Sequence, residues 1–133
     1  MKRFFIAIMI LVVSAGVGFA DENKYAQATF PEKTYDFGII KEENGLVSTV
    51  FEVVNTGNKP LIIVDVAVSC GCTSHEYTKK PIAPGKKGKI KVFYNPAGRP
   101  GAFRKDIKVR TNGRERRTTL FIEGTTIPAS ENN

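Results

Sequence analysis

The chain has 133 residues, of which 20 are Lys or Arg and 13 are Asp or Glu, so its formal net charge is +7 at pH 7. This length suffices for one ordinary domain and excludes an enzyme with separate catalytic and substrate domains.

Residues 1–20 are typical of a secretory signal peptide. Lys2 and Arg3 precede an apolar run, and Gly18 and Ala20 are the small residues that a signal peptidase requires. The apolar stretch is shorter than the ~20 residues of a membrane-spanning helix. We therefore expect cleavage after Ala20, a periplasmic or secreted location and no transmembrane span. No cysteine lies near the cleavage point, so we expect no lipid anchor.

After the signal, the sequence pattern is typical of β-strands. Short runs of Val, Ile, Phe and Thr alternate with Gly, Pro and Asn, and no sustained helical periodicity is present. The predicted strands span residues 28–30, 35–39, 46–55, 61–69, 88–95, 101–111 and 117–124. A lead-in at 21–27 precedes the predicted domain at 28–127, and a disordered tail is expected at 128–133.

About seven short strands in roughly 100 residues predict an all-β fold, in which two antiparallel sheets pack face to face as an immunoglobulin-like β-sandwich. An antibody-type domain is excluded, because there is no Trp and the two cysteines lie too close in sequence to join two sheets. The strand at 61–69 is the most apolar, which predicts a central place in its sheet. Alternation predicts two inward-facing sets, Val47, Thr49, Phe51 and Val53 on one strand and Phe103, Ile107 and Val109 on another.

Both cysteines lie in the motif Ser69-Cys70-Gly71-Cys72-Thr73, where the apolar strand ends. The chain also contains Tyr35-Asp36-Phe37-Gly38, the segment 51–57, Pro60-Leu61, Pro84-Gly85 with Gly88 following, Gly101-Ala102-Phe103, Thr111-Asn112 and Gly124. Together with the cysteine motif, and in this order, these segments resemble the bacterial domain-of-unknown-function family 1573. The resemblance implies a small exported or lipid-anchored protein with an immunoglobulin-like sandwich similar in shape to sperm-protein and pilus-chaperone domains, and it implies no reaction.

Three interpretations of Cys70 and Cys72 are open. They extend the apolar face of the strand as small buried side chains; or they form a disulfide, which an oxidising compartment favours; or they bind copper or zinc with His75, the only histidine. A three-residue loop gains only about 1.6 kcal/mol from closure, so a bridge here suits redox exchange better than stability. The metal set is thin, so our leading expectation is no cofactor. We expect Cys70 to be buried and Cys72 to be more accessible.

No catalytic residue is predicted. A Cys-His pair could act as nucleophile and base only if the loop folded His75 onto a thiol. The triplet Asp36-Phe37-Gly38 matches a kinase magnesium motif by accident, because no glycine-rich phosphate loop accompanies it. It predicts a bend and a buried ring instead.

The segment 99–117 carries eight basic residues and only two acids. Alternation places Arg104, Lys108 and Arg110 on the solvent face of its first strand, where they form a candidate docking face for an anionic partner. The alternative is an edge hairpin whose charges prevent aggregation.

These features predict an exported, non-catalytic sandwich that binds an envelope protein or an anionic envelope polymer rather than nucleic acid. The alternative is a thiol-redox or metal-handling protein that uses the Cys70-Gly71-Cys72 motif.

Overall fold

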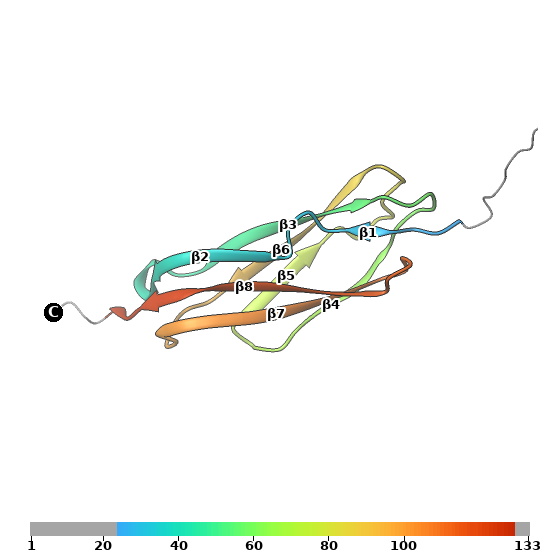
Figure 1. Ribbon diagram of the computed structural model, residues 1–133. Helices are drawn as coiled ribbons and strands as arrows, with labels where there is room; N and C mark the ends of the chain where they lie inside the picture. The colour runs from blue at the N-terminus through green and yellow to red at the C-terminus, as the bar shows by residue number, and fades with distance from the viewer. Residues whose placement is uncertain (1–23, 130–133) are drawn as a thin grey trace, which may run out of the picture.

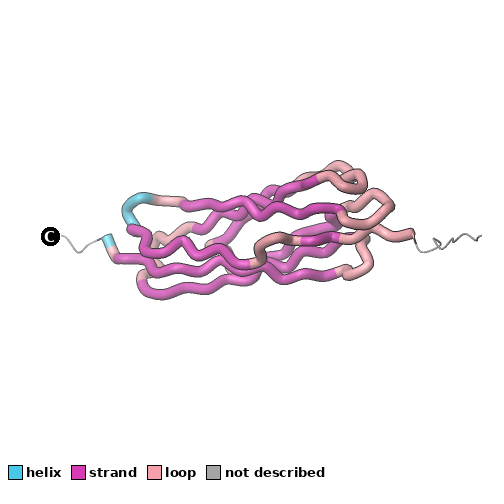
Figure 2. Tube along the Cα trace, turned by 45° about the horizontal axis from the view of Figure 1, so that its top comes forward, coloured by secondary structure: helices cyan, strands magenta, loops and turns pink. Residues whose placement is uncertain are grey.

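The computed structural model describes residues 24–129, and within this range the chain forms eight strands in two sheets (Figure 1). The strands are β1 (Ala28–Thr29), β2 (Thr34–Lys41), β3 (Val47–Asn55), β4 (Ile63–Val68), β5 (Thr73–Tyr77), β6 (Lys87–Tyr94), β7 (Gly101–Thr111) and β8 (Arg117–Ile127), and a short 3-10 helix, η2 (Glu42–Asn44), follows β2. The strands run along the length of the molecule and the loops gather at its two ends (Figure 2). The predicted signal peptide lies outside the described residues.

The two sheets have the strand orders β1-β3-β6-β5 and β2-β8-β7-β4. This arrangement confirms the predicted immunoglobulin-like sandwich. One expectation is wrong in detail, because β2 pairs with β8 in parallel. Strands β1 and β2 belong to different sheets, because the chain crosses from one sheet to the other between them without reversing its direction. In the first sheet β1 pairs antiparallel with β3, and in the second β2 pairs parallel with β8.

The core lies between the sheets, and the predicted alternation holds in both strands where it was sharpest. Phe51 and Val53 are buried while Val50 and Glu52 face solvent. On β7, Ile107 and Val109 are buried. The inward-facing ring of Phe103 stacks on the buried ring of Tyr94 with centroids 4.1 Å apart.

Strand β4 differs from its prediction in its position within the sheet. It pairs only with β7 and lies at the edge of its sheet, so the expected central place is wrong. A register shift between Ile63 and Asp65 turns the strand over. As a result Ile63 and Val66 are both buried although they differ in parity, and Val64 is exposed. The strand is rich in apolar residues because odd-numbered side chains face the core before the bulge and even-numbered side chains face it afterwards.

The triplet Asp36-Phe37-Gly38 forms the expected bend in β2. Gly38 has a φ of 73°, and its N–H donates to Asp36 Oδ1 at 2.8 Å. Phe37 packs against the core. The bend brings Gly38 against β8, where a Cβ on Gly124 would lie 2.8 Å from Gly38 O, so glycine is needed at that position too.

Candidate functional site

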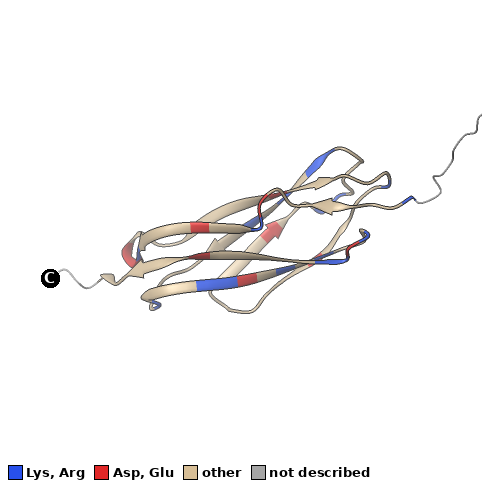
Figure 3. Ribbon diagram, in the orientation of Figure 1, with Lys and Arg blue, Asp and Glu red and all other residues tan. Residues whose placement is uncertain are grey.

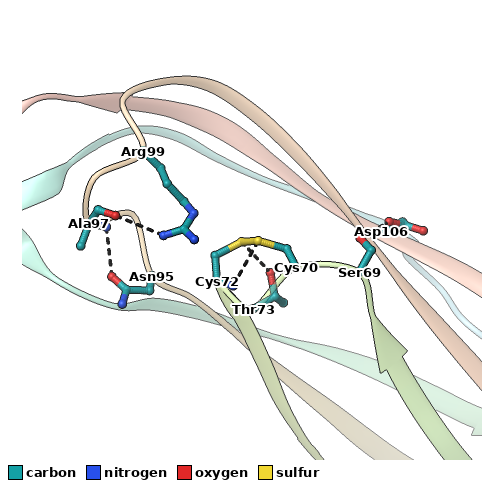
Figure 4. The surroundings of a disulfide bond; sticks show 8 residues. All are labelled: Ser69, Cys70, Cys72, Thr73, Asn95, Ala97, Arg99 and Asp106. Atoms are coloured by element: carbon teal, nitrogen blue, oxygen red, sulfur yellow. Dashed lines mark hydrogen bonds between the residues drawn. A yellow bond between two sulfur atoms is a disulfide. The ribbon is translucent and has the colours of Figure 1, made fainter.

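The Cys70-Gly71-Cys72 motif forms the connection between β4 and β5, at which the chain passes from one sheet to the other. A disulfide joins the two cysteines, whose Cα atoms lie 5.1 Å apart (Figure 4). This is the second of the three interpretations. A redox role for the bond stays a prediction.

The burial of the two sulfur-bearing residues is the reverse of the expectation. Cys72 is only 4% exposed and belongs to the core, whereas Cys70 is half-buried at the rim. The reason is the unpredicted strand β5, which begins at Thr73. Cys72 is held against the end of β6 because its carbonyl accepts the N–H of Asn95 at 2.8 Å.

Three further hydrogen bonds fix the motif. The Thr73 N–H donates to Cys70 O at 3.1 Å, and the Cys72 N–H contacts Cys70 Sγ at 3.1 Å. On the entry side, the Ser69 hydroxyl donates to Asp106 Oδ1 on β7 at 2.9 Å. The side chain of Arg99 reaches toward the disulfide from the neighbouring loop (Figure 4).

His75 is not brought to the sulfurs as a ligand or base. Its Nε2–H donates to Val66 O at 2.8 Å, which ties β5 to β4 across the edge of the sandwich. Between residues 24 and 129 no cluster of three or more His, Cys, Asp or Glu side chains is arranged to hold a metal ion. A copper or zinc site at Cys70, Cys72 and His75 therefore stays a prediction for the reduced protein, since only free thiolates are metal ligands.

The predicted docking face of Arg104, Lys108 and Arg110 lies on the outer surface of β7, as expected. Each cation is paired there with a carboxylate: Arg104 with Glu123 at 2.7 Å, Lys108 with Asp106 at 3.5 Å and Arg110 with Asp65 at 2.5 Å. Exposed pairs of this kind contribute little to stability, but they cancel local charge. Binding of an anionic partner at this face stays a prediction, and the ion pairs reduce the uncompensated positive charge that would attract such a partner.

The structure adds a feature that the sequence analysis missed, a free edge on β3. Strand β1 is two residues long and pairs only with Val54 and Asn55, whereas β6 pairs with the whole of β3 as far as Val54. The N–H of Asn55 donates to the backbone oxygen of Lys86, directly before β6, and that of Thr56 donates to the backbone oxygen of Gln27 on the opposite side. Backbone groups alternate along a strand, so those of Ser48, Val50 and Glu52 point away from β6, where no described strand pairs with them.

An open groove of about 350 Å³ runs beside this edge, between β3 and the start of β2. Its lining includes Tyr35 and Val50, which are 42% and 45% exposed, together with Pro31 and Thr34. The two charged residues that line it are Glu32 and Glu52, both acidic. The groove is thus mainly apolar with an acidic rim, and β3 presents unpaired backbone to it.

Comparison with known protein families gives one match, which covers most of the chain. The model of the family described as Protein of unknown function (DUF1573) matches residues 28–126. No curated protein sequence matches the chain.

Solved structures show the same fold at low sequence identity. A protein of unknown function from Porphyromonas gingivalis W83 aligns over 80% of this chain and 49% of its own, with a TM-score of 0.67 and 13% identity. The Vibrio cholerae VesB protease aligns over 75% of this chain and 32% of its own, with a TM-score of 0.62 and 19% identity. The PapD-like domain 7 of human CEP192 aligns over 90% of this chain and 98% of its own, with a TM-score of 0.58 and 13% identity.

The chain spans about half of the Porphyromonas protein and about a third of the protease. These likenesses show the fold alone. No helix among residues 24–129 has the length and apolar content needed to cross a membrane.

Proposed function

The chain belongs to the family Protein of unknown function (DUF1573), and from this premise we propose that it is an exported, non-catalytic sandwich that binds an extended segment of another cell-envelope protein along the free edge of β3. The family description states no reaction, so the function is argued from the site. The observation that carries the proposal is the unpaired backbone of Ser48, Val50 and Glu52 beside the apolar groove.

A free strand edge binds an extended peptide through main-chain hydrogen bonds, while neighbouring pockets select its side chains. The added strand would continue the line of β1 along β3. The groove defines the chemistry of the segment. An apolar side chain fits between Tyr35 and Val50, and a basic side chain suits the acidic rim at Glu32, which makes no ion pair with a described residue.

Export is supported by the sequence of residues 1–20, in which Lys2 and Arg3 precede an apolar run that ends in small residues. A non-catalytic role is supported by the surroundings of His75, whose Nε2 is bonded to a backbone carbonyl rather than to a nucleophile. The compensated charges on β7 favour the sheet edge over the basic face as the main binding surface.

Site-specific photo-crosslinking in the envelope of the producing cell tests this function. A photoreactive residue at Val50 should give one discrete crosslinked protein, and the same residue at Lys108, on the other sheet, should not. A Val50→Pro change removes the backbone donor that the partner needs and leaves the β6 side of β3 paired, whereas Val50→Ala keeps the donor. The crosslinked protein should therefore bind the Ala variant and lose at least tenfold affinity for the Pro variant. Equal binding of both variants would contradict strand addition.

A second candidate function rests on the disulfide itself. The bond closes a ring too small to stabilise the fold much, and Cys70 is the sulfur at the rim. In thiol exchange, a thiolate of a partner dithiol attacks Cys70 Sγ, the S–S bond breaks, and Cys72 leaves as a thiolate that takes up a proton. The second partner thiol then displaces Cys70 from the mixed disulfide. Two electrons pass from the partner dithiol, which becomes the oxidised disulfide.

Single-cysteine variants distinguish this candidate. Cys72→Ser leaves the rim thiol of Cys70 free, and its thiolate should attack the disulfide form of envelope partners, so that Cys70 becomes joined to one partner sulfur and the other partner sulfur leaves as a thiolate. Cys70→Ser leaves only the buried sulfur and should form few such mixed disulfides. Equal trapping by both variants, or trapping by neither, would leave the bond with a packing role.

A further inference from the structure

A basic pocket of about 510 Å³ lies at the end of the sandwich where three segments meet. These segments are the residues before β1, the loop that leads into β4, and the loop 112–116 between β7 and β8. The four charged side chains in its lining are Lys24, Lys59, Arg114 and Arg116. All four are basic, and all belong to exposed residues.

The pocket is built on a hydrogen-bonded frame. Asn112 and Ile62 are joined twice, by Asn112 N–H to Ile62 O at 3.1 Å and by Ile62 N–H to Asn112 Oδ1 at 2.7 Å. The Arg114 N–H donates to Ala26 O at 2.8 Å. Gly113 is buried between them, and a Cβ there would lie 3.3 Å from Ala26 O. The absence of a side chain at Gly113 thus allows the loop to pack closely onto the N-terminal segment.

The charge of this pocket is not compensated. No carboxylate lines it, and none of its four cations forms an ion pair with a residue in the described part of the chain. Glu115 lies on the same loop but outside the lining. Figure 3 shows basic segments on the loops at the end of the molecule opposite the C-terminus. The cations of the β7 face, in contrast, each have a carboxylate partner.

Arg114 is held in place before any ligand arrives. Its Nη1–H donates to the Tyr25 hydroxyl at 2.9 Å, and its guanidinium carbon lies 4.7 Å from the centroid of the Tyr25 ring. The ring face attracts the cation, and the remaining N–H groups of the planar guanidinium stay available. A guanidinium fixed in this way offers two parallel donors to a phosphate oxygen pair.

We propose that this pocket binds clustered phosphate groups, using Arg114 and Arg116 as fork-shaped donors and Lys24 and Lys59 as point charges. The four cations carry four positive charges, whereas one phosphate group carries at most about two negative charges near neutral pH, so we assign to the pocket a ligand with at least two phosphate groups. This site is separate from the β3 groove and shares none of its residues. Its test can therefore fail while the proposed function stands.

The probe is inorganic tripolyphosphate, titrated into the mature protein at low ionic strength and followed by amide NMR shifts and calorimetry. The pocket variant is Lys59→Gln, Arg114→Gln and Arg116→Gln together. The matched control is Arg104→Gln, Lys108→Gln and Arg110→Gln, which removes the same three charges from the compensated face. Unfolding curves of both variants check that the fold is retained, and an Arg114→Lys single variant tests the role of the fork.

We expect saturable binding of one tripolyphosphate, a loss of at least tenfold in the pocket variant, less than twofold in the control, and an intermediate loss for Arg114→Lys. Equal losses in the two triple variants would show that net charge alone drives binding and would overturn the proposal, as would the absence of saturable binding.

Vesicles of phosphatidylglycerol and of phosphatidylcholine identify the source of the phosphates. Binding to phosphatidylglycerol that tripolyphosphate displaces assigns lipid headgroups to the pocket, and tripolyphosphate binding without vesicle binding assigns soluble or polymer-borne phosphate. Vesicle binding that tripolyphosphate does not displace would place the lipid elsewhere and overturn the assignment.

Discussion

The side-chain amide of Asn55 donates a hydrogen bond to the backbone oxygen of Ile82 at 2.9 Å, although Asn55 is completely buried. The same amide nitrogen donates to Lys59 O at 2.7 Å, and its oxygen accepts the N–H groups of Gly57 and Gln27. One side chain thus satisfies four backbone groups from three segments at the end of β3. A buried polar group is tolerated only when it is bonded in this way.

Replacing Asn55 by Ala should therefore be costly. The change leaves several backbone groups buried without partners, and we expect a loss of about 3 kcal/mol in the free energy of unfolding. Chemical denaturation measures it. The matched control is Asn58→Ala, since Asn58 is exposed and its side-chain oxygen accepts one bond, from Tyr25 N–H; there we expect a loss below about 1 kcal/mol. Similar losses in the free energy of unfolding for both variants would show that the side chain of Asn55 does not stabilise the backbone at this end of β3.

Phe51 is the second test of the core. Its side chain is 3% exposed in the middle of β3, so Phe51→Ala should lower the free energy of unfolding by about 3 to 5 kcal/mol. Val50→Ala, one position along on the outer face, should lower it by less than about 1 kcal/mol. A loss below that level at Phe51 would contradict the inward face assigned to this strand.

These two residues also show how far the sequence could be interpreted. The alternation around Phe51 predicts its burial, because a strand with one solvent-exposed face carries apolar residues at every second position. The burial of Asn55 is not predicted, since no local pattern marks a side chain that bonds to residues 27 and 82. Long-range backbone partners of this kind become visible only in the folded chain.

The candidate sites divide in the same way. The nearness of Cys70 and Cys72 follows from their spacing, but their relative burial depends on β5, whose sequence Thr-Ser-His-Glu-Tyr lacks an apolar alternation. Alternation predicts that Arg104 and Arg110 lie on the solvent face of their strand. It does not predict their ion-pair partners, Glu123 and Asp65, which come from two other strands. The edge of β3 is free because β1 is short. The length of β1 depends on how the strands pair in the folded protein, and no single residue in the sequence marks it.

Amide hydrogen exchange tests that free edge directly. The N–H groups of Phe51 and Val53 lie in the ladder with β6, while those of Val50 and Glu52 point away from β6, on the side where the groove lies. We expect the first pair to exchange with the slow rates of the core and the second pair to exchange much faster, since solvent reaches them without unfolding. Slow exchange at Val50 and Glu52 in the isolated protein would indicate that another segment already covers the edge.

A hydrogen bond beside the disulfide predicts a pH effect. The Ser69 hydroxyl holds the pKa of Asp106 below its ordinary value, and Lys108 adds to this effect. Because the folded pKa is lowered, the stabilisation is present above the unfolded value of about 3.9 and is lost as the pH falls through the folded pKa. Ser69→Ala should raise the pKa of Asp106, measured by NMR titration of its carboxyl group. An unchanged pKa would show that the hydroxyl does not bond to the carboxylate in solution.

The two cysteines should differ in reactivity once the bond is reduced. Cys70 lies at the rim, whereas Cys72 is buried against β6 and held there by the Asn95 N–H. Thiolates react according to their exposure and their electrostatic surroundings, and the side chain of Arg99 reaches toward this turn (Figure 4). A bulky maleimide added to the reduced, folded protein should therefore modify Cys70 first, as peptide mapping after a short exposure would show.

The Cys70→Ser variant is the matched control, because its remaining thiol should react only after denaturant is added. Prompt labelling of Cys72 in that variant would mean that reduction frees the start of β5 from β6, and the disulfide would then be what keeps Cys72 in the core.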